Sequence, residues 1–384
     1  MLIVDAHQDL AWNMLTFGRD YTRSAGETRR LEAGGEAPLR NGDSLLGWPD
    51  YQRGRVAVVF SVLFVTPAHR REAWETVFYR DADQAHSLYR AQLDMYHQLT
   101  GEHPERFRML QYRGELDELL AHWIRSDLDL VFDEGEGNGR DPHHRAEGEA
   151  RPGHPVGLVM LIEGAEGVRE PSELDEWWRL GVRLIGPAWA GTRFCGGTRE
   201  PGPLTKEGYD LLEGMADLGF LLDVAHMDEW ALMQALDSYP GAIASTHANV
   251  QSLLKGEESN RHLSERAIRG LLEREAVLGV SPVNPFLLPG WKRGDRRGQV
   301  SLQHLVDHID HICQLAGDAH HVGLGTDFDG GFGVQSVPLE IDTVADLQKL
   351  APMLGERGYS DDDTAAILGG NWLDLLHDTL PEGS

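Results

Sequence analysis

Short apolar runs alternate along this chain with longer stretches in which apolar residues recur at helical spacing. The runs are rich in Val, Ile and Leu and lack strict polar–apolar alternation, which is typical of strands buried on both faces. Eight runs are expected to be strands: Leu2–Asp5, Val56–Val65, Val156–Ile162, Val182–Ile185, Phe220–Val224, Ala242–Ser245, Val277–Pro282 and His321–Gly325.

Amphipathic stretches between these runs predict helices. Strands that alternate with helices indicate the α/β class, and eight such units favour a closed (β/α)8 barrel, the TIM barrel. An open, doubly wound sheet is the alternative, but it normally carries a Gly-rich phosphate loop after an early strand, and the sequence has none. The predicted helices are Arg71–Leu99, Gly114–Ser126, Ser172–Leu180, Lys206–Leu218, Asp228–Tyr239, Ser264–Arg274 and Ser301–Ala316, with two more in Asp342–Leu376.

Two segments read as loop insertions in a single barrel domain that spans residues 1–384. Asp20–Asp50 is rich in Gly, Arg, Pro and Glu and follows the first strand. That connection lies on the catalytic face of a barrel, so we expect it to border the active site. Gly135–Pro155 precedes the third strand and is expected on the opposite face.

Charge and cysteine content narrow the function classes. Asp and Glu number 62 against 35 Lys and Arg, which gives a net charge of -27. This balance lacks the basic footprint that phosphate groups need, so it argues against a nucleic-acid partner and against an anionic membrane. The two cysteines, Cys195 and Cys313, fit a reducing compartment. Because no signal peptide or membrane span is evident, we expect a cytoplasmic protein.

Ionisable side chains collect where the predicted strands end. The carboxyl ends of barrel strands converge on one face, so we expect these side chains to meet there. Burying six ionisable groups together without a cation would be costly, which favours a metal site over a purely structural role. Imidazole with carboxylate suits zinc, and also manganese or cobalt. The six residues are His7, Asp9, Glu163, His226, His247 and Asp327.

The candidate ligands suggest two ions rather than one. Leaving Asp327 aside, five remain, which exceeds the three protein ligands typical of a catalytic zinc. Two ions about 3.5–4 Å apart, with one carboxylate bridging them, can hold a hydroxide and polarise a carbonyl group. Asp327 would then take the proton of the attacking water and pass it to the leaving amine.

In combination, these residues resemble the membrane (renal) dipeptidases and their bacterial relatives. Each piece alone is unspecific, but their joint occurrence in this order is highly specific. The pieces are Asp-Ala-His-Gln-Asp-Leu at 5–10, Ile-Glu-Gly at 162–164, Gly-Val-Arg at 181–183, Asp-Val-Ala-His at 223–226, Ser-Thr-His-Ala-Asn at 245–249, Asn-Arg-His-Leu-Ser-Glu at 260–265 and Gly-Leu-Gly-Thr-Asp-Phe-Asp-Gly at 323–330.

The resemblance implies a binuclear zinc barrel that hydrolyses dipeptides, often with a D-residue at the C-terminal side, and that forms a homodimer. By this resemblance His7 and Asp9 hold one zinc, and His226 and His247 hold the other. Glu163 bridges the two ions.

Three further roles follow from the same resemblance. Asp327 is similar to the catalytic acid/base of the family, and Arg261 matches the arginine that grips the substrate carboxylate with its planar fork of donors. Trp189 stands where animal members have a substrate-contacting histidine, so we expect it to border the substrate. It could instead be ordinary core packing.

Two alternatives remain open on the sequence. One is a different amidohydrolase-like enzyme, such as a deaminase, lactonase or phosphotriesterase. Those enzymes commonly carry a His-x-His pair on the first strand and a carboxylated Lys as bridge, where this chain has His7-x-Asp9 and Glu163. The other is a non-catalytic metal-binding protein, which would have no need for Asp327.

Overall fold

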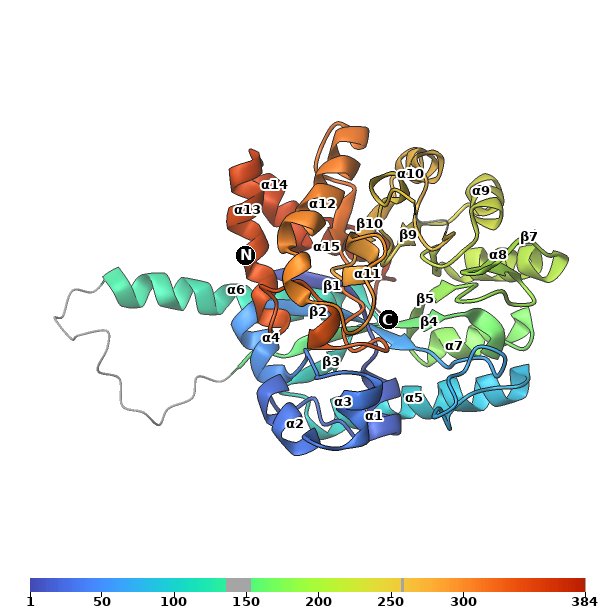
Figure 1. Cartoon of the computed structure of the whole chain (residues 1–384), viewed down its shortest axis with the longest axis horizontal. Coiled ribbons are helices and arrows are strands. Elements are labelled where there is room, and N and C mark those ends of the chain that lie inside the picture. Colours follow the sequence, from blue (N-terminus) through green and yellow to red (C-terminus); the bar gives the residue numbers. More distant parts are fainter. Residues whose placement is uncertain (136–152, 257–258, 384) are drawn as a thin grey trace.

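Eight parallel strands close into a barrel in the computed structural model, which describes residues 1–135, 153–256 and 259–383 (Figure 1). The sheet order is β2-β1-β11-β10-β9-β8-β5-β4, and a further β2–β4 pairing closes it. This confirms the predicted (β/α)8 barrel. The strands are β1 (Ile3–Gln8), β2 (Val56–Leu63), β4 (Val156–Glu163), β5 (Val182–Gly186), β8 (Leu221–Asp223), β9 (Ile243–Ser245), β10 (Val277–Val280) and β11 (Val322–Leu324).

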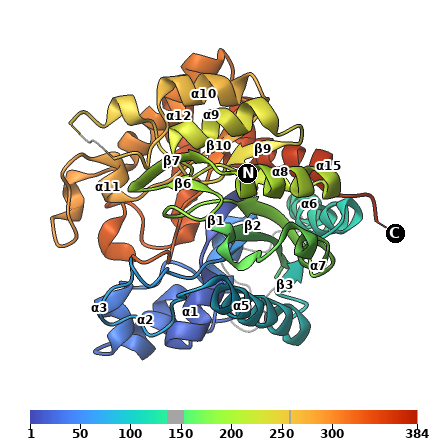
Figure 2. The same ribbon diagram turned by 90° about the vertical axis from the view of Figure 1, so that its right-hand side faces the viewer.

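Helices surround the barrel and pack their apolar faces against it (Figures 1 and 2). Several begin at a side-chain cap; for example, Ser264 accepts the Ala267 N–H and Asp228 accepts the Trp230 N–H. The helices around the barrel include α5 (Ala82–Glu102), α6 (Arg113–Gly135), α7 (Leu174–Arg179), α8 (Lys206–Leu218), α9 (Glu229–Ser238), α10 (Glu265–Leu272), α12 (Leu302–Ala316), α13 (Leu350–Arg357) and α15 (Asn371–Thr379).

Three predictions from the sequence need correction. Helix α5 begins at Ala82 rather than at Arg71, because the Asp81 side chain caps its first turn at the Gln84 N–H. The segment expected as the Asp20–Asp50 loop holds short helices instead: α2 (Ala25–Glu32), α3 (Glu36–Arg40) and the start of α4 (Trp48–Gly54). The sequence reading also missed β3 (Phe107–Met109) at the edge of β4 and the hairpin β6–β7 (Cys195–Gly197, Glu200–Leu204).

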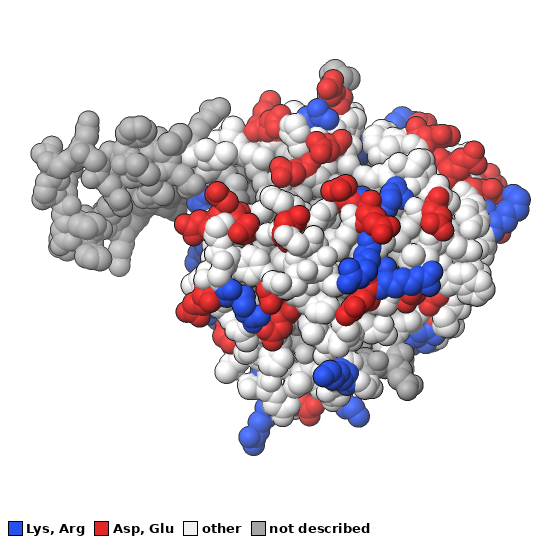
Figure 3. All heavy atoms as spheres, turned by 90° about the horizontal axis from the view of Figure 1, so that it is seen from above, with Lys and Arg blue, Asp and Glu red and all other residues white. Residues whose placement is uncertain are grey.

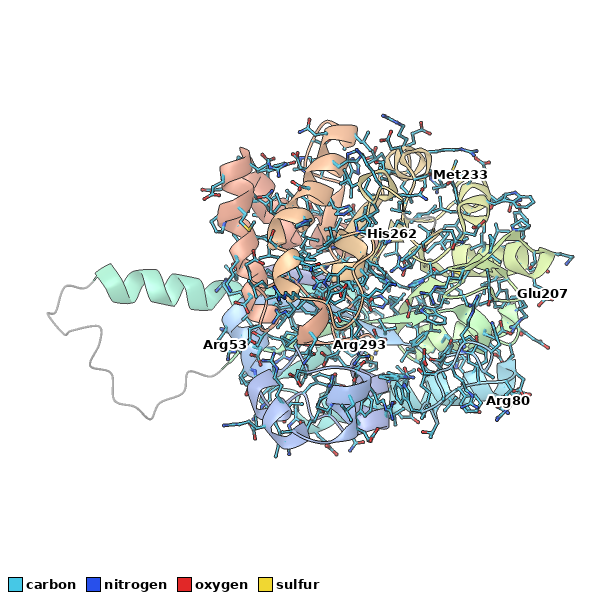
Figure 4. The ribbon with its side chains drawn as sticks, in the orientation of Figure 1. Arg53, Arg80, Glu207, Met233, His262 and Arg293 are labelled. Carbon is cyan, nitrogen blue, oxygen red and sulfur yellow. The ribbon has the colours of Figure 1, made fainter. Side chains whose placement is uncertain are left out.

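The inserted helices α2 and α3 are tied to other connections of the barrel. Arg293, labelled in Figure 4, follows α11 (Asn284–Leu287) and donates to the carbonyl oxygens of Leu39 and Arg40 in α3. The other predicted insertion, 135–155, falls largely on residues 136–152, which lie outside the described residues, so that part stays a prediction.

The interior of the barrel is closed by an aromatic side chain from the last helix. Trp372 of α15 is fully buried and packs edge-on against Phe60 of β2 at 5.2 Å between ring centroids. Its indole N–H donates to the Leu324 carbonyl, and Gly323 has no side chain that would collide with it. Trp372 therefore fills this part of the barrel interior with its own polar group satisfied.

The surface agrees with the acidic composition. On the face in Figure 3, acidic and basic side chains are interspersed, without a continuous basic area. Within residues 1–135, 153–256 and 259–383, no helix is both long and apolar enough to cross a bilayer.

Candidate metal centre

All six ionisable residues predicted from the strand ends lie at the carboxyl end of the barrel. His7 is the penultimate residue of β1 and Glu163 is the last residue of β4. His226 and His247 follow β8 and β9 by three and two residues. Parallel strands bring these ends to one face, so residues distant in sequence meet in one buried cluster.

One group of side chains gathers around Glu163 from β8 and β9. The Nε2 atoms of His226 and His247 lie 2.9 and 3.4 Å from Glu163 Oε1, and 2.9 Å from each other. Tetrahedral zinc with bonds of about 2.0–2.1 Å places its ligand atoms about 3.3 Å apart. These three ligand atoms therefore have the spacing that a single divalent ion requires, and they can form one ligand set.

A second group shares the same carboxylate. His7 Nε2 lies 3.7 Å from Glu163 Oε1 and 3.8 Å from Asp9 Oδ2. Both ring nitrogens of His7 and the Oδ1 atom of Asp9 are buried without a hydrogen-bond partner among the described residues. An unsatisfied buried polar atom costs free energy, so His7 Nε2 and Asp9 Oδ1 fit a cation that would ligate them. Glu163 belongs to both groups.

Burial keeps the three imidazoles in the form that binds metal. It lowers the pKa of His7, His226 and His247 well below the usual value, and the positive charge of Arg261 lowers each further. A metal ligand must be a neutral imidazole with a free lone pair. The centre therefore presents unprotonated rings at neutral pH.

The carboxylates of the cluster experience the opposite effect. Burial raises the pKa of Glu163 and Asp327 well above the usual value, and the charge of Asp9 raises both further. Burial also raises the pKa of Asp9, to about 7. Ionisation of neighbouring buried acids is unfavourable because their negative charges repel each other. It becomes favourable when divalent cations neutralise these charges. The donor set thus fits divalent metal ions.

Asp327 reaches the same cluster from the loop after β11. Its Oδ1 lies 4.0 Å from His7 Nε2, and its side chain is 16% exposed, more than the other acids of the cluster. The backbone of Asp327 is left-handed (φ 60°) and its N–H donates to the His7 carbonyl. A Cβ on Gly330 would meet the carboxylates of Asp327 and Asp9 at 2.1 and 2.7 Å, so only glycine leaves room for both.

Two acids that sequence reasoning did not single out hold the residues that precede His247 and Asp327. Asp223, at the end of β8, accepts the N–H (2.9 Å) and the hydroxyl (2.7 Å) of Thr246, the residue before His247. Asp5 of β1 accepts the N–H (2.7 Å) and the hydroxyl (2.6 Å) of Thr326, the residue before Asp327. The visible signal was an acid shortly before a histidine in each strand-end motif.

Asp329 holds the loop that carries Asp327, and it was also missed. The Asp329 carboxylate is fully buried. Its Oδ2 accepts from Arg19 Nη1 (2.9 Å), the Tyr21 hydroxyl (3.0 Å) and Ser44 Oγ (2.8 Å), and its Oδ1 accepts from the Leu45 N–H (2.9 Å). The insertion after β1 is thereby anchored beside the metal centre, as its place in the sequence predicted.

The hairpin β6–β7 contributes one more contact to the centre. Thr198, between the two strands, lies with its hydroxyl 2.9 Å from His226 Nδ1. Figure 2 shows this hairpin in front of the barrel strands. The Gly- and Pro-rich sequence of the hairpin carried no strand pattern that could have revealed Thr198.

Arg261 is buried at the edge of the cluster rather than exposed in a polar loop. Its Nη1 donates to the Ala225 carbonyl (3.0 Å) and its Nη2 to the His247 carbonyl (2.6 Å). Its guanidinium lies 5.2 Å from the centroid of the Phe286 ring. These contacts fix the planar group while using two of the five N–H donors that a guanidinium carries.

Trp189 follows β5 and borders the cluster. Its ring centroid lies 6.3 Å from that of His226 and 5.1 Å from that of Phe64. The Trp189 side chain is partly exposed, whereas the rings of the core are fully buried. The tryptophan therefore forms part of the wall of the site.

Comparison with known proteins agrees with this geometry. The sequence profile of the membrane dipeptidases, peptidase family M19, matches residues 145–380. The chain is 32% identical over 231 residues to an uncharacterised protein from the pqqA 5′ region of Klebsiella pneumoniae. The matched region covers 58% of this chain and 81% of that protein. It is 26% identical over 235 residues to the dipeptidase tcpJ of Claviceps purpurea, across 58% of this chain and 51% of the relative.

Solved structures show the same fold over the whole chain. A metallopeptidase from Rhodobacter sphaeroides superposes with a TM-score of 0.74 at 22% identity, covering 99% of both chains. The probable dipeptidase PvdM from Pseudomonas aeruginosa superposes with a TM-score of 0.75 at 19% identity, covering 99% of this chain and 96% of the other. The profile match confirms the resemblance seen in the motifs: this chain is an enzyme of the membrane dipeptidase family.

Proposed function

We propose that this enzyme holds two divalent metal ions, zinc by preference, and uses them to hydrolyse the peptide bond of a dipeptide. The observation that carries the proposal is the shared position of Glu163, whose Oε1 lies within 3.7 Å of the Nε2 atoms of His7, His226 and His247. In this assignment His7 and Asp9 would hold one ion, His226 and His247 would hold the other, and Glu163 would be shared by both.

When bound, such ions supply Lewis-acid chemistry: they polarise the scissile carbonyl and lower the pKa of the water that attacks it. The protein supplies the proton transfer. The Asp327 carboxylate, partly exposed beside His7, accepts the proton of the attacking water and delivers it to the nitrogen of the leaving amine. Gly330 keeps the space next to Asp327 open for this movement.

Arg261 and Trp189 define where a dipeptide would lie. The remaining donors of the fixed Arg261 guanidinium are suited to the substrate carboxylate, with charge-assisted hydrogen bonds. Trp189 borders His226 and supplies an apolar wall. The Rhodobacter sphaeroides structure holds a phosphinate mimic of the dipeptide L-Ala-D-Ala, which supports a small dipeptide, with a D-residue tolerated at its C-terminal side, as the substrate class here.

From the sequence, we propose that the chain acts as a single catalytic domain and works in the cytoplasm, and from the family resemblance alone, that it assembles as a homodimer. Gel filtration with light scattering measures the mass of the assembly, and a mass of one chain would refute the homodimer.

A small substrate panel tests the function. The zinc-loaded enzyme is incubated with L,L-dipeptides, L,D-dipeptides, a lactone and a phosphotriester, each with and without a chelator. We expect chelator-sensitive release of amino acids from at least one dipeptide. Turnover of the lactone or phosphotriester alone would favour a different amidohydrolase-like enzyme, and no turnover by fully loaded protein would favour a non-catalytic role.

Asp327→Asn separates proton transfer from metal binding. General acid–base catalysis contributes about 10²–10⁴-fold to a rate, so kcat is expected to fall by that factor while the metal content stays at the wild-type value. Metal content is measured by elemental analysis after gel filtration. Loss of metal in Asp327→Asn would show that Asp327 is a ligand and not the proton carrier.

A further inference from the structure

A chain of hydrogen bonds lies behind His247, on the side away from Glu163. Asp223 Oδ2 lies 2.7 Å from the Thr246 hydroxyl, and the same hydroxyl lies 3.0 Å from His247 Nδ1. The other oxygen of Asp223 accepts the N–H groups of Thr246 (2.9 Å) and Ala225 (3.1 Å). All of these groups are buried.

The direction of these bonds is set by the carboxylate. An ionised carboxylate can only accept, so the Thr246 hydroxyl must give its single hydrogen to Asp223. Toward His247 the same oxygen can then only accept, which requires the proton of the imidazole to be on Nδ1. Nε2 is left with its lone pair, facing Glu163 and His226.

We propose that Asp223 and Thr246 are positioning residues that fix the Nδ1–H tautomer of His247 and so aim its Nε2 lone pair at the metal centre. The inference rests on the proposed function only for the identity of what Nε2 binds. Outer partners of this kind orient a metal-binding histidine and typically change metal affinity 10–100-fold when removed.

The same pairing occurs a second time without an imidazole. Asp5 accepts the N–H and hydroxyl of Thr326 as Asp223 does from Thr246. The Thr326 hydroxyl, however, accepts from the Phe328 N–H (3.1 Å) instead of from a ring nitrogen. Thr326 therefore serves as a matched control: its replacement breaks an equivalent buried bond but leaves every histidine partner in place.

Two measurements on the full chain test the role. The first is the zinc dissociation constant, by competition with a chromophoric chelator, for wild type, Thr246→Val, Thr246→Ser and Thr326→Val. We expect a 10–100-fold weaker constant for Thr246→Val, recovery to within about threefold in Thr246→Ser, and a constant within about threefold of wild type for Thr326→Val.

The second measurement is the tautomer of His247 in the metal-free protein, from ¹⁵N and ¹³C chemical shifts of labelled histidine, with the signal assigned by its loss in His247→Gln. Wild type is expected to show Nδ1–H. Asp223→Asn should reverse the chain, because its amide donates to Thr246, which then donates to Nδ1 and leaves the proton on Nε2. A merely structural role would not move the proton.

Unchanged zinc affinity in Thr246→Val with Nδ1–H retained in Asp223→Asn would overturn the inference, as would an equal loss of affinity in Thr326→Val. Failure of the proposed function gives a different result: the wild-type protein would bind no zinc or cleave no dipeptide. The tautomer measurement needs no metal, so it decides the positioning role in that case too.

Discussion

Asp329→Asn tests whether the anchor of the catalytic loop is electrostatic. The substitution removes one buried negative charge and keeps the size of the side chain. Asn tolerates the left-handed backbone that Asp329 adopts (φ 63°), so no strain is added. The substitution removes an acceptor. The NH2 group of the asparagine can only donate, and it would face groups that donate to Asp329 Oδ2, namely Arg19, Tyr21 and Ser44.

The cost follows from the contacts. Removing one partner of a buried ion pair typically costs about 3–5 kcal/mol, since it leaves the other charge uncompensated. Arg19 keeps a second partner, Glu32, at 2.9 Å, so we take the lower end, about 3 kcal/mol in the free energy of unfolding. With an unfolding entropy of about 2.1 cal/mol/K per residue over this chain, that loss lowers Tm by about 4 °C.

Glu32→Gln is the matched control. It removes a charge from the same guanidinium, but the Glu32 side chain is 13% exposed against 0% for Asp329, so water can replace it. We expect a cost of about 1 kcal/mol. Thermal unfolding and urea midpoints measure both variants on metal-free protein. Equal costs for the two, or less than about 1 kcal/mol for Asp329→Asn, would refute the electrostatic account.

Removal of metal by a chelator should lower Tm by about 3 °C for each bound ion when free zinc was 100 times the dissociation constant, because each ion then adds about 2.7 kcal/mol to the stability of the folded state. Glu163→Gln should abolish most of that shift. Burial lowers the pKa of His308 to about 4 from 6.5, so the unfolded chain takes up a proton that the folded chain refuses. The contribution of His308 to stability is therefore full above pH 6.5 and falls by about 3 kcal/mol toward pH 4, and His308→Gln should remove this part of the acid-induced loss while His311→Gln keeps it. Gly330→Ala should place a methyl group against Asp327 and lower kcat at least tenfold, with the fold intact by circular dichroism.

Specific outcomes would contradict these three expectations. A chelator shift that Glu163→Gln leaves unchanged would place the stabilising ion outside the cluster. Equal acid sensitivity of His308→Gln and wild type in urea unfolding between pH 7 and pH 4 would assign that sensitivity to other groups. Wild-type turnover in Gly330→Ala would show that the loop can shift to make room.

The barrel was predictable because its strands carry a strong local signal. A strand buried on both faces must be largely apolar, as Val56–Leu63 is apart from Ser61, so each of the eight strands stood out. The hairpin at 195–204 escaped because its residues, rich in Gly and Pro, pair only with each other. The start of α5 was misplaced because helical spacing extends past Asp81, whose capping role depends on side-chain geometry.

The cluster of candidate ligands was predictable from position, and the residues that support it were not. His7, Glu163 and His247 stand at strand ends, where the fold alone brings them together. Thr198 and Asp329 act through partners far away in the sequence, which no local pattern announces. Arg261 was found only through the family resemblance, and its burial could not be inferred from the polar segment around it.

Structural and functional acids at these strand ends differ in how their oxygen atoms are satisfied. Both oxygens of Asp5 and of Asp223 accept N–H and O–H groups of the protein, so these acids can remain ionised without a cation. Asp9 has a buried oxygen with no partner among the described residues, and Glu163 faces the Nε2 atom of His247, which carries no hydrogen in the proposed Nδ1–H tautomer. Zinc should therefore raise the stability that depends on Asp9 and Glu163 and leave the contribution of Asp5 and Asp223 unchanged.

Asp9→Asn is expected to stabilise the metal-free protein, because it relieves repulsion among buried acids, and to destabilise the zinc-loaded protein relative to wild type. Urea unfolding in the two states measures this reversal of sign, and destabilisation of the same size in both states would show that Asp9 is a structural acid after all.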